Sequence, residues 1–163
     1  MRDLEESLRR VYNRDYPLVN ALAGNEIPIP NAYRTTFEYV LNADLLRSFQ
    51  SEKINIHLVE RTMAEMVKWE LSIEDTDKVE RLAGESIFKE LKRIAGEGDN
   101  PKRIDRLNRL FPLLKKFNIK PNLSKSQNLY FEISLATRSS HSRSEEWMKL
   151  FNQLGENLSV KVE

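Results

Sequence analysis

The spacing of apolar residues constrains this chain more than any other feature of its sequence. From Tyr33 to Phe49, and again from Val79 to Ile94, apolar side chains recur every three or four positions. This is the period of an α-helix that buries one face. The 5 glycines and 6 prolines fall mainly between such segments, where they would separate one helix from the next. The pattern predicts an all-α fold, a single compact bundle of six or seven helices.

Residues with capping or helix-breaking roles mark the boundaries of the later helices. Asn100 is predicted to cap a helix that begins at Pro101, and Pro112 is predicted to kink or break it near Phe111. Two sequences of the capping-box type are predicted to start the last two helices: Ser124 to Gln127 and Ser142 to Glu145.

The two ends of the chain are predicted to be less regular. A short helix would carry Leu4 to Tyr12, and Pro17 would separate it from the next apolar residues. Gly155 stands near the expected end of the last helix, and the alternating tail over 159–163 would pack locally or fray. Residues 1–163 are expected to form one helical domain, either freestanding or the C-terminal part of a longer enzyme.

Charge and composition exclude several classes of protein. The chain has 26 basic and 25 acidic residues, so no global field attracts nucleic acid. It has no cysteine, which excludes disulfides and thiolate metal sites. No apolar stretch approaches the roughly 18 residues of a membrane-spanning helix. We therefore expect a cytoplasmic protein that needs no cofactor, metal or membrane.

The sequence offers no convincing catalytic residue. His57 and His141 each lack a second histidine at metal-ligand spacing, and they are interpreted as a first-turn residue and a loop residue. The carboxylates over 70–77 are interpreted as solvated side chains near a helix start. Trp69 and Trp147 lie at the edges of apolar patterns and are predicted to pack in the core.

One basic segment, Lys102 to Lys116, could hold anions. Lys102, Arg106 and Arg109 are predicted to share a helix face that could contact phosphate groups. Asp105 lies in the same helix, and no aromatic residues are interleaved with the basic ones. A solvated helix face is therefore favoured over nucleic-acid binding.

Three short stretches are similar to a known family: Asp15-Tyr16-Pro17 leading to Ile27-Pro28-Ile29-Pro30, then Phe37 to Leu45, and finally Asn122 to Tyr130. From residue 15 onward, their order resembles a helical domain of unknown function found C-terminal to the catalytic barrel in some family 57 glycoside hydrolase-like proteins. The resemblance implies a separate barrel that acts on α-glycans. This chain is too short and too helical to contain that barrel, so no catalytic residue is carried over.

The resemblance implies a non-catalytic accessory domain that packs on the barrel or shapes its substrate approach. Gln127, Asn128 and Tyr130 match the family's most specific stretch, and they are the candidate contacts to the barrel or to a glycan. The structural alternative is that they cap and pack the helix. A freestanding protein-interaction module, and after it a phosphate or nucleic-acid binder, are the alternative functions.

Overall fold

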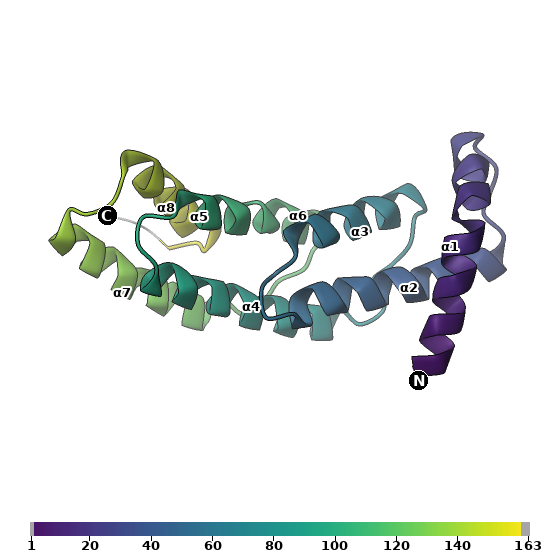
Figure 1. Ribbon diagram of the computed structural model, residues 1–163, viewed down its shortest axis with the longest axis horizontal. Coiled ribbons are helices and arrows are strands. Elements are labelled where there is room, and N and C mark those ends of the chain that lie inside the picture. Colours follow the sequence, from purple (N-terminus) through teal and green to yellow (C-terminus); the bar gives the residue numbers. More distant parts are fainter. Residues whose placement is uncertain (1, 161–163) are drawn as a thin grey trace. The chain divides into compact units, whose positions relative to one another are not determined.

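The computed structural model describes residues 2–160, and all regular secondary structure in this range is α-helical (Figure 1). The helices are α1 (Arg2–Gly24), α2 (Asn31–Gln50), α3 (Ile56–Lys68), α4 (Thr76–Gly96), α5 (Pro101–Asn108), α6 (Leu110–Lys116), α7 (Ser124–Ser140) and α8 (Glu145–Asn157). Only Arg109 separates α5 from α6, so these two form one interrupted helix. The expected all-α fold of six or seven helices is confirmed.

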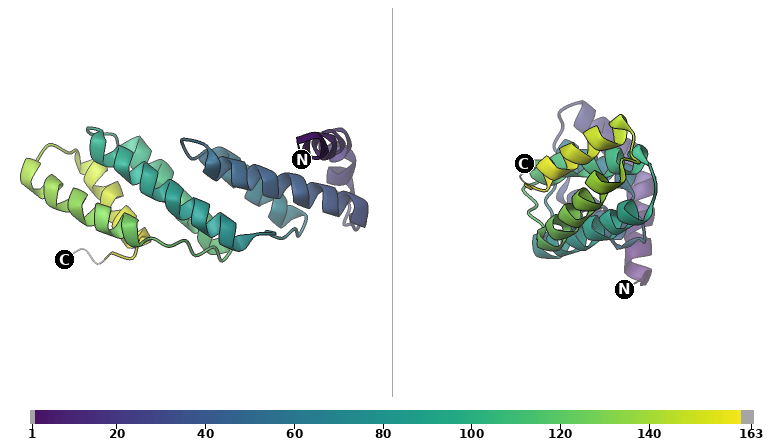
Figure 2. Two further views of the ribbon diagram at one scale, coloured as in Figure 1. Left: turned by 90° about the horizontal axis from the view of Figure 1, so that it is seen from below. Right: turned by 90° about the vertical axis from the view of Figure 1, so that its left-hand side faces the viewer.

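The helices group into two compact units. Unit 1 comprises Met1–Ser48 and His57–Asp75, and unit 2 comprises Phe49–Ile56 and Thr76–Glu163. In unit 2, α4 packs on α7 and α5 packs on α8 (Figure 2). The expectation of one domain over 1–163 stays a prediction.

The core of unit 1 is built from aromatic side chains of α1 and α2 around Trp69. The Trp69 ring lies 4.8 Å from that of Phe37, and Phe37 lies 4.5 Å from Tyr12, measured between ring centroids. Both Trp69 and Phe37 are buried, as the helical period predicts. Edge and tilted contacts of this kind add to the free energy gained by burying the rings.

The α1 helix is longer than the sequence suggests. It continues through Pro17 to Gly24, so the predicted short helix ending before Pro17 is wrong. Residues on both sides of Pro17 are held by tertiary contacts: the Tyr16 hydroxyl donates to Glu65, and Val19 is fully buried. These contacts offset the hydrogen bond that proline cannot make.

The core of unit 2 contains an aromatic stack between α7 and α8. The Phe151 ring lies 4.3 Å from Tyr130 and 4.6 Å from Trp147, with nearly parallel planes. Gly155 lies in the last turn of α8, which ends at Asn157, so the expected position near the end of the last helix is confirmed. A Cβ atom at Gly155 would overlap the Tyr130 hydroxyl oxygen, which explains why this position is glycine.

The α5 helix starts and ends close to the predicted positions, but with different contacts. Asn100 occupies the N-cap position, yet its side-chain amide donates to Glu97 rather than capping the helix. The break falls at Arg109, three residues before Pro112. In an uninterrupted helix the ring of Pro112 would clash with the carbonyl of Asn108, the last residue of α5, and the break relieves this clash.

The first predicted capping box is wrong. α7 begins at Ser124 itself, and Leu123 occupies the N-cap position without a side-chain cap. The Gln127 amide instead donates to the carbonyl oxygen of Leu158 at 2.8 Å. Gln127 thus holds the end of α8, where it donates to a carbonyl that has no partner within the helix.

The second capping box is displaced by two residues. Ser144, not Ser142, caps α8, and its Oγ accepts a hydrogen bond from the Trp147 backbone at 3.1 Å. His141 ends α7 in the left-handed conformation, with φ 44°. Beyond α8, the Val160 amide bonds the Gly155 carbonyl, so the start of the tail packs locally, while 161–163 lie outside the described residues.

Candidate functional site

The three residues predicted to contact a barrel or a glycan have different environments on α7. Tyr130 is only 1% exposed, and its hydroxyl donates to the Phe151 carbonyl at 3.0 Å. Burial raises the pKa of Tyr130 to about 12. A contact role for Tyr130 is therefore wrong, because the ring is enclosed in the core. Gln127 holds Leu158, and Asn128 alone of the three is exposed.

Asn128 shares its helix face with an apolar pair that the sequence interpretation missed. Phe131 is 58% exposed and Leu135 is 49% exposed, at three and seven residues after Asn128. The sequence did contain a signal that some of these apolar residues are exposed, because the apolar run from Leu129 to Phe131 is wider than one buried helix face.

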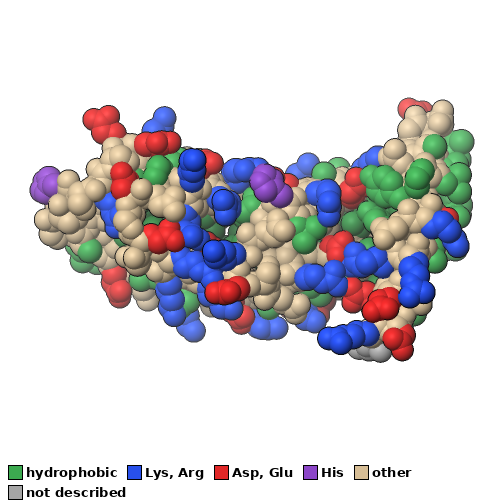
Figure 3. Space-filling model, viewed as in Figure 1, with side chains coloured by type: hydrophobic (Ala, Val, Ile, Leu, Met, Phe, Trp, Pro, Cys, Tyr) green, Lys and Arg blue, Asp and Glu red, His purple; other side chains and the backbone are tan. Residues whose placement is uncertain are grey.

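The basic segment gives an exposed face of mixed charge. Lys102, Arg106 and Arg109 are all exposed on α5 and directly after it, as the spacing predicts, and Asp105 is exposed beside them. Acidic and basic side chains are interspersed on this view of the molecule (Figure 3). Neighbouring Arg103 is neutralised by Glu97, at 2.6 Å, and by a carboxylate of α4.

The histidines lie where the sequence placed them. His57 is in the first turn of α3, with its Nδ1 3.6 Å from the Glu60 carboxylate, and His141 is the C-cap of α7. The carboxylates over 70–77 that were interpreted as solvated are exposed: Glu70, Glu74, Asp75 and Asp77. Among residues 2–160, no group of three or more His, Asp or Glu is arranged to hold a metal ion.

Unit 1 carries an exposed apolar patch at the C-terminal end of α1 and in the loop after it. Leu18 is 52% exposed and Ile27 is 50% exposed. Hydrophobic side chains gather over this part of unit 1 in Figure 3. We use "apolar patch" for five exposed residues: Pro17, Leu18, Ala21, Ile27 and Pro28.

The loop that completes the apolar patch is ordered by backbone contacts. The Ile27 amide donates to the Leu22 carbonyl at 2.9 Å, and Glu26 adopts a positive φ of 57°. This turn folds the loop back along the end of α1, so Ile27 is presented by a fixed backbone.

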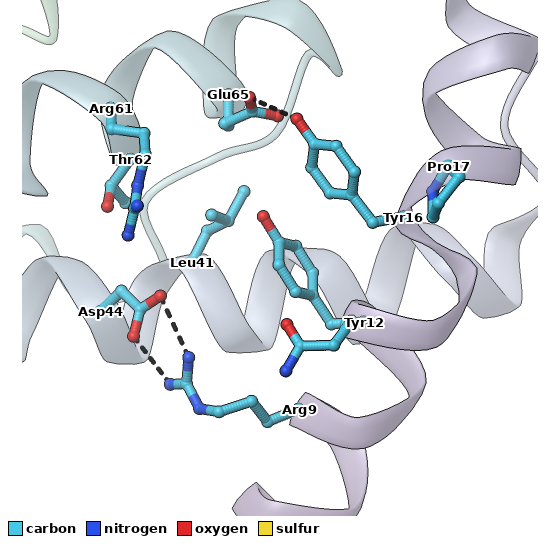
Figure 4. Close-up of a pocket in the computed structure, with 10 residues that line it drawn as sticks. Arg9, Tyr12, Tyr16, Pro17, Leu41, Asp44, Arg61, Thr62 and Glu65 are labelled. Carbon is cyan, nitrogen blue, oxygen red and sulfur yellow. Dashed lines mark hydrogen bonds and ion pairs between the residues drawn. The ribbon is translucent and has the colours of Figure 1, made fainter.

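A pocket of about 410 Å³ lies beside the apolar patch within unit 1 (Figure 4). Side chains from three helices line it: Arg9, Tyr12, Asn13, Tyr16 and Pro17 from α1, Leu41 and Asp44 from α2, and Arg61, Thr62 and Glu65 from α3. Pro17 belongs to both features, so the pocket opens next to the apolar patch.

One wall of the pocket is a closed ion-pair network. Arg9 donates to both oxygens of Asp44, at 2.7 and 3.2 Å, and Arg47 donates to Asp44 at 3.0 Å. Both arginines also bind Glu5. The hydrogen bonds from Arg47 and then Arg9 hold the pKa of Glu5 below its usual value.

The opposite wall carries two tyrosine hydroxyls. Tyr16 donates to Glu65 Oε1 at 2.8 Å, whereas the Tyr12 hydroxyl has no hydrogen-bond partner among the described residues. Burial is the main cause that raises the pKa of both tyrosines, with Glu65 adding to the effect. Both hydroxyls therefore stay protonated near neutral pH.

The sequence contained a partial signal for this pocket. Tyr12 and Tyr16 are four residues apart, as are Arg61 and Glu65, so each pair lies on one helix face. The sequence could not show that the two faces meet, because their helices are separated by most of unit 1.

Comparison with known proteins identified no relative of this chain. A scan against protein-family models, a search of curated proteins and a search of solved structures each found no match. No helix within residues 2–160 combines the length and apolar character needed to cross a membrane.

Proposed function

We propose that this chain is a non-catalytic helical accessory domain that packs on the catalytic barrel of an α-glycan-active enzyme. The observation that carries the proposal is the apolar patch of unit 1. Leu18 and Ile27, each at least half exposed, lie near the end of α1 and in the loop that follows it. Apolar surface of this kind gains free energy when a partner covers it, and contiguous exposed patches are typical of protein interfaces.

The kind of partner follows from the resemblance to family 57 glycoside hydrolase-like proteins. Its middle stretch, Phe37 to Leu45, contributes buried side chains, so core packing accounts for much of it. Its first stretch supplies three exposed residues of the apolar patch: Pro17, Ile27 and Pro28. Packing within the chain does not account for these residues, and contact with a barrel would.

Association with such a barrel is the test. The chain would be mixed with the family 57-like barrel encoded in the same genome, and the dissociation constant measured by calorimetry. Replacing Leu18 and Ile27 together by serine should weaken binding at least about tenfold, since two anchors at an interface commonly contribute more than 1.4 kcal/mol.

The matched control is the double replacement of Phe131 and Leu135 by serine, because these side chains have similar exposure on unit 2. It should leave the dissociation constant within about twofold. The absence of such a barrel from the genome, or of binding to it, would contradict the accessory function. Loss of binding in the control variant alone would move the interface to α7.

The exposed pair on α7 supports one other candidate function, a freestanding protein-interaction module. Phe131, Leu135 and Asn128 form an apolar face with a polar neighbour, which a partner helix could cover. Binding of a partner other than a barrel through this face would favour that function. The phosphate or nucleic-acid alternative has weaker support, because the positive charge of the basic face is reduced. Asp105 is exposed beside the basic residues, and Arg103 is paired with Glu97.

A further inference from the structure

We propose that the pocket between α1, α2 and α3 binds one ring of a neutral sugar. The inference concerns unit 1 alone, and it does not require that the chain packs on a barrel. It rests on which polar groups in the pocket lack partners, on the charge balance of the walls and on the size of the cavity.

Three polar groups of the pocket are left without partners by the protein. Arg61 makes no hydrogen bond or ion pair with a described residue, and the Tyr12 hydroxyl makes none either. Glu65 Oε2 is buried and has no hydrogen-bond partner, although Oε1 of the same carboxylate accepts from Tyr16. A buried carboxylate oxygen without a donor is costly, so a ligand hydroxyl that displaces the atoms covering Oε2 and donates to it gains binding free energy.

Figure 4 shows how these groups are arranged. Arg61 extends from α3 on one side, while the Tyr12 ring extends from α1 with its hydroxyl directed toward the middle of the view. Glu65 lies beyond, where it accepts the Tyr16 hydroxyl. Donors and an acceptor thus surround one space from different helices.

The charge balance selects the ligand class. Arg9 and Arg61 carry the positive charges of the pocket, and Asp44 and Glu65 carry equal negative charge. An anion would be repelled by the carboxylates and a cation by the arginines. An apolar ligand would leave the polar walls without water or partners.

A sugar hydroxyl matches these walls because it both donates and accepts. It can donate to Glu65 while neighbouring hydroxyls accept from Arg61 and Tyr12. The cavity, at about 410 Å³, lies within the range of small-molecule sites. Binding rather than hydrolysis is expected, since both Asp44 oxygens are engaged by arginines.

The test is a titration of the full chain with neutral oligosaccharides, followed by amide chemical shifts in NMR. The probes are maltotetraose, cellotetraose and mannotetraose, with glucose 6-phosphate and glucosamine as charged comparisons. We expect saturable binding of at least one neutral probe, with shifts in α1 and α3. Tyr12→Phe and Arg61→Gln should each weaken that binding at least about fivefold, the equivalent of one hydrogen bond.

The control is Arg10→Gln, on α1 and outside the pocket lining, which should change the affinity by less than twofold. Arg61 is exposed, so its replacement leaves the fold intact even if Tyr12→Phe loosens the core. No saturable binding of any neutral probe, tighter binding of a charged one, or unchanged affinity in Arg61→Gln would each overturn the proposal. Because the barrel is absent from this titration, its outcome is independent of the accessory function.

Discussion

At the scale of single residues, Gly155 lies directly against the ring of Tyr130. The tyrosine ring occupies the space where a Cβ at residue 155 would lie, with its Cζ at 2.7 Å from that position. The ring is also held by its stack on Phe151 and by its hydroxyl bond to the Phe151 carbonyl. It therefore has little freedom to move away.

Gly155→Ala should lower the free energy of unfolding by about 1 to 3 kcal/mol, because the added methyl overpacks a fixed core. The gain in helix propensity of about 1 kcal/mol is too small to compensate. Urea unfolding measures the difference. The matched control is Gly96→Ala, where nothing lies within 4 Å, and it should leave stability unchanged or raise it by up to about 1 kcal/mol.

Adding Tyr130→Phe to Gly155→Ala should restore part of the lost stability, because the hydroxyl oxygen makes the shortest of the contacts. Equal stability of Gly155→Ala and the unmodified chain would show that α7 and α8 are not this close.

The sequence predicted buried aromatic residues better than it predicted the role of a glycine. Trp69, Trp147 and Tyr130 lie in or beside apolar periods, and burial follows from that. The position of Gly155 near the end of α8 was predictable, but its contact with a ring was not, because a glycine that ends a helix and one that admits a neighbouring ring look alike in the sequence. Only the position of Tyr130 on another helix distinguishes them.

At the scale of secondary structure, the start of α8 depends on a single serine. Ser144→Ala should lower the free energy of unfolding by about 1 kcal/mol, since the Trp147 amide loses its acceptor. Ser142→Ala removes a hydroxyl from an exposed residue that caps nothing, and it should change stability by less than about 0.5 kcal/mol. Thermal unfolding of both variants decides between the two serines; a larger loss in Ser142→Ala would restore the original capping box.

The junction between α4 and α5 should make stability depend on pH. Hydrogen bonds from Arg103, and then from Asn100, lower the pKa of Glu97. A carboxyl group whose pKa is lowered by folding stabilises the folded chain at pH values above its ordinary pKa. This stabilisation is lost as the pH falls. Glu97→Gln should therefore reduce the loss of stability between about pH 5 and pH 3, by about 0.5 kcal/mol for this partly exposed pair.

Arg103→Gln removes the partner and should reduce the same pH dependence, as followed by urea unfolding at each pH. If Glu97→Gln and the unmodified chain lose stability equally over that range, the ion pair does not contribute in solution.

The presence of helices was predictable, and so was the start of α5 at Pro101, but the residue that caps α8 was not. Four serines from Ser139 to Ser144 offer several similar capping positions, and the contacts of α8 select one of them. Pro17 shows the opposite case, since burial of Val19 and the Tyr16 bond override a local helix breaker. Tertiary contacts decide which serine caps α8 and whether α1 continues through Pro17. The local sequence alone does not show these contacts.

At the scale of the whole molecule, the prediction of one domain can be tested with the two tryptophans. Trp69 reports on unit 1 and Trp147 on unit 2. α2 and α3 each contribute residues to both units, so we expect the units to unfold together. The Trp147→Phe variant keeps only Trp69, and the Trp69→Phe variant keeps only Trp147. In each variant, the unfolding transition followed by fluorescence should coincide with the transition followed by circular dichroism. Separate transitions for fluorescence and circular dichroism would show two domains.

The fold class was predictable at this scale because it depends on periodicity alone, whereas the pocket and the apolar patch were not. Arg61 and Tyr12 line one pocket only after α1 and α3 have packed. Likewise, nothing in the local sequence distinguishes the exposed Leu18 from the buried Val19 until the neighbouring helices are in place.

Hydrogen–deuterium exchange with and without the barrel tests the accessory function most directly, because it locates the interface on the chain. The proposal predicts slower exchange over residues 17–30, where the apolar patch lies, and unchanged exchange over 124–140. Unchanged exchange over 17–30, at barrel concentrations that saturate the chain, would contradict it.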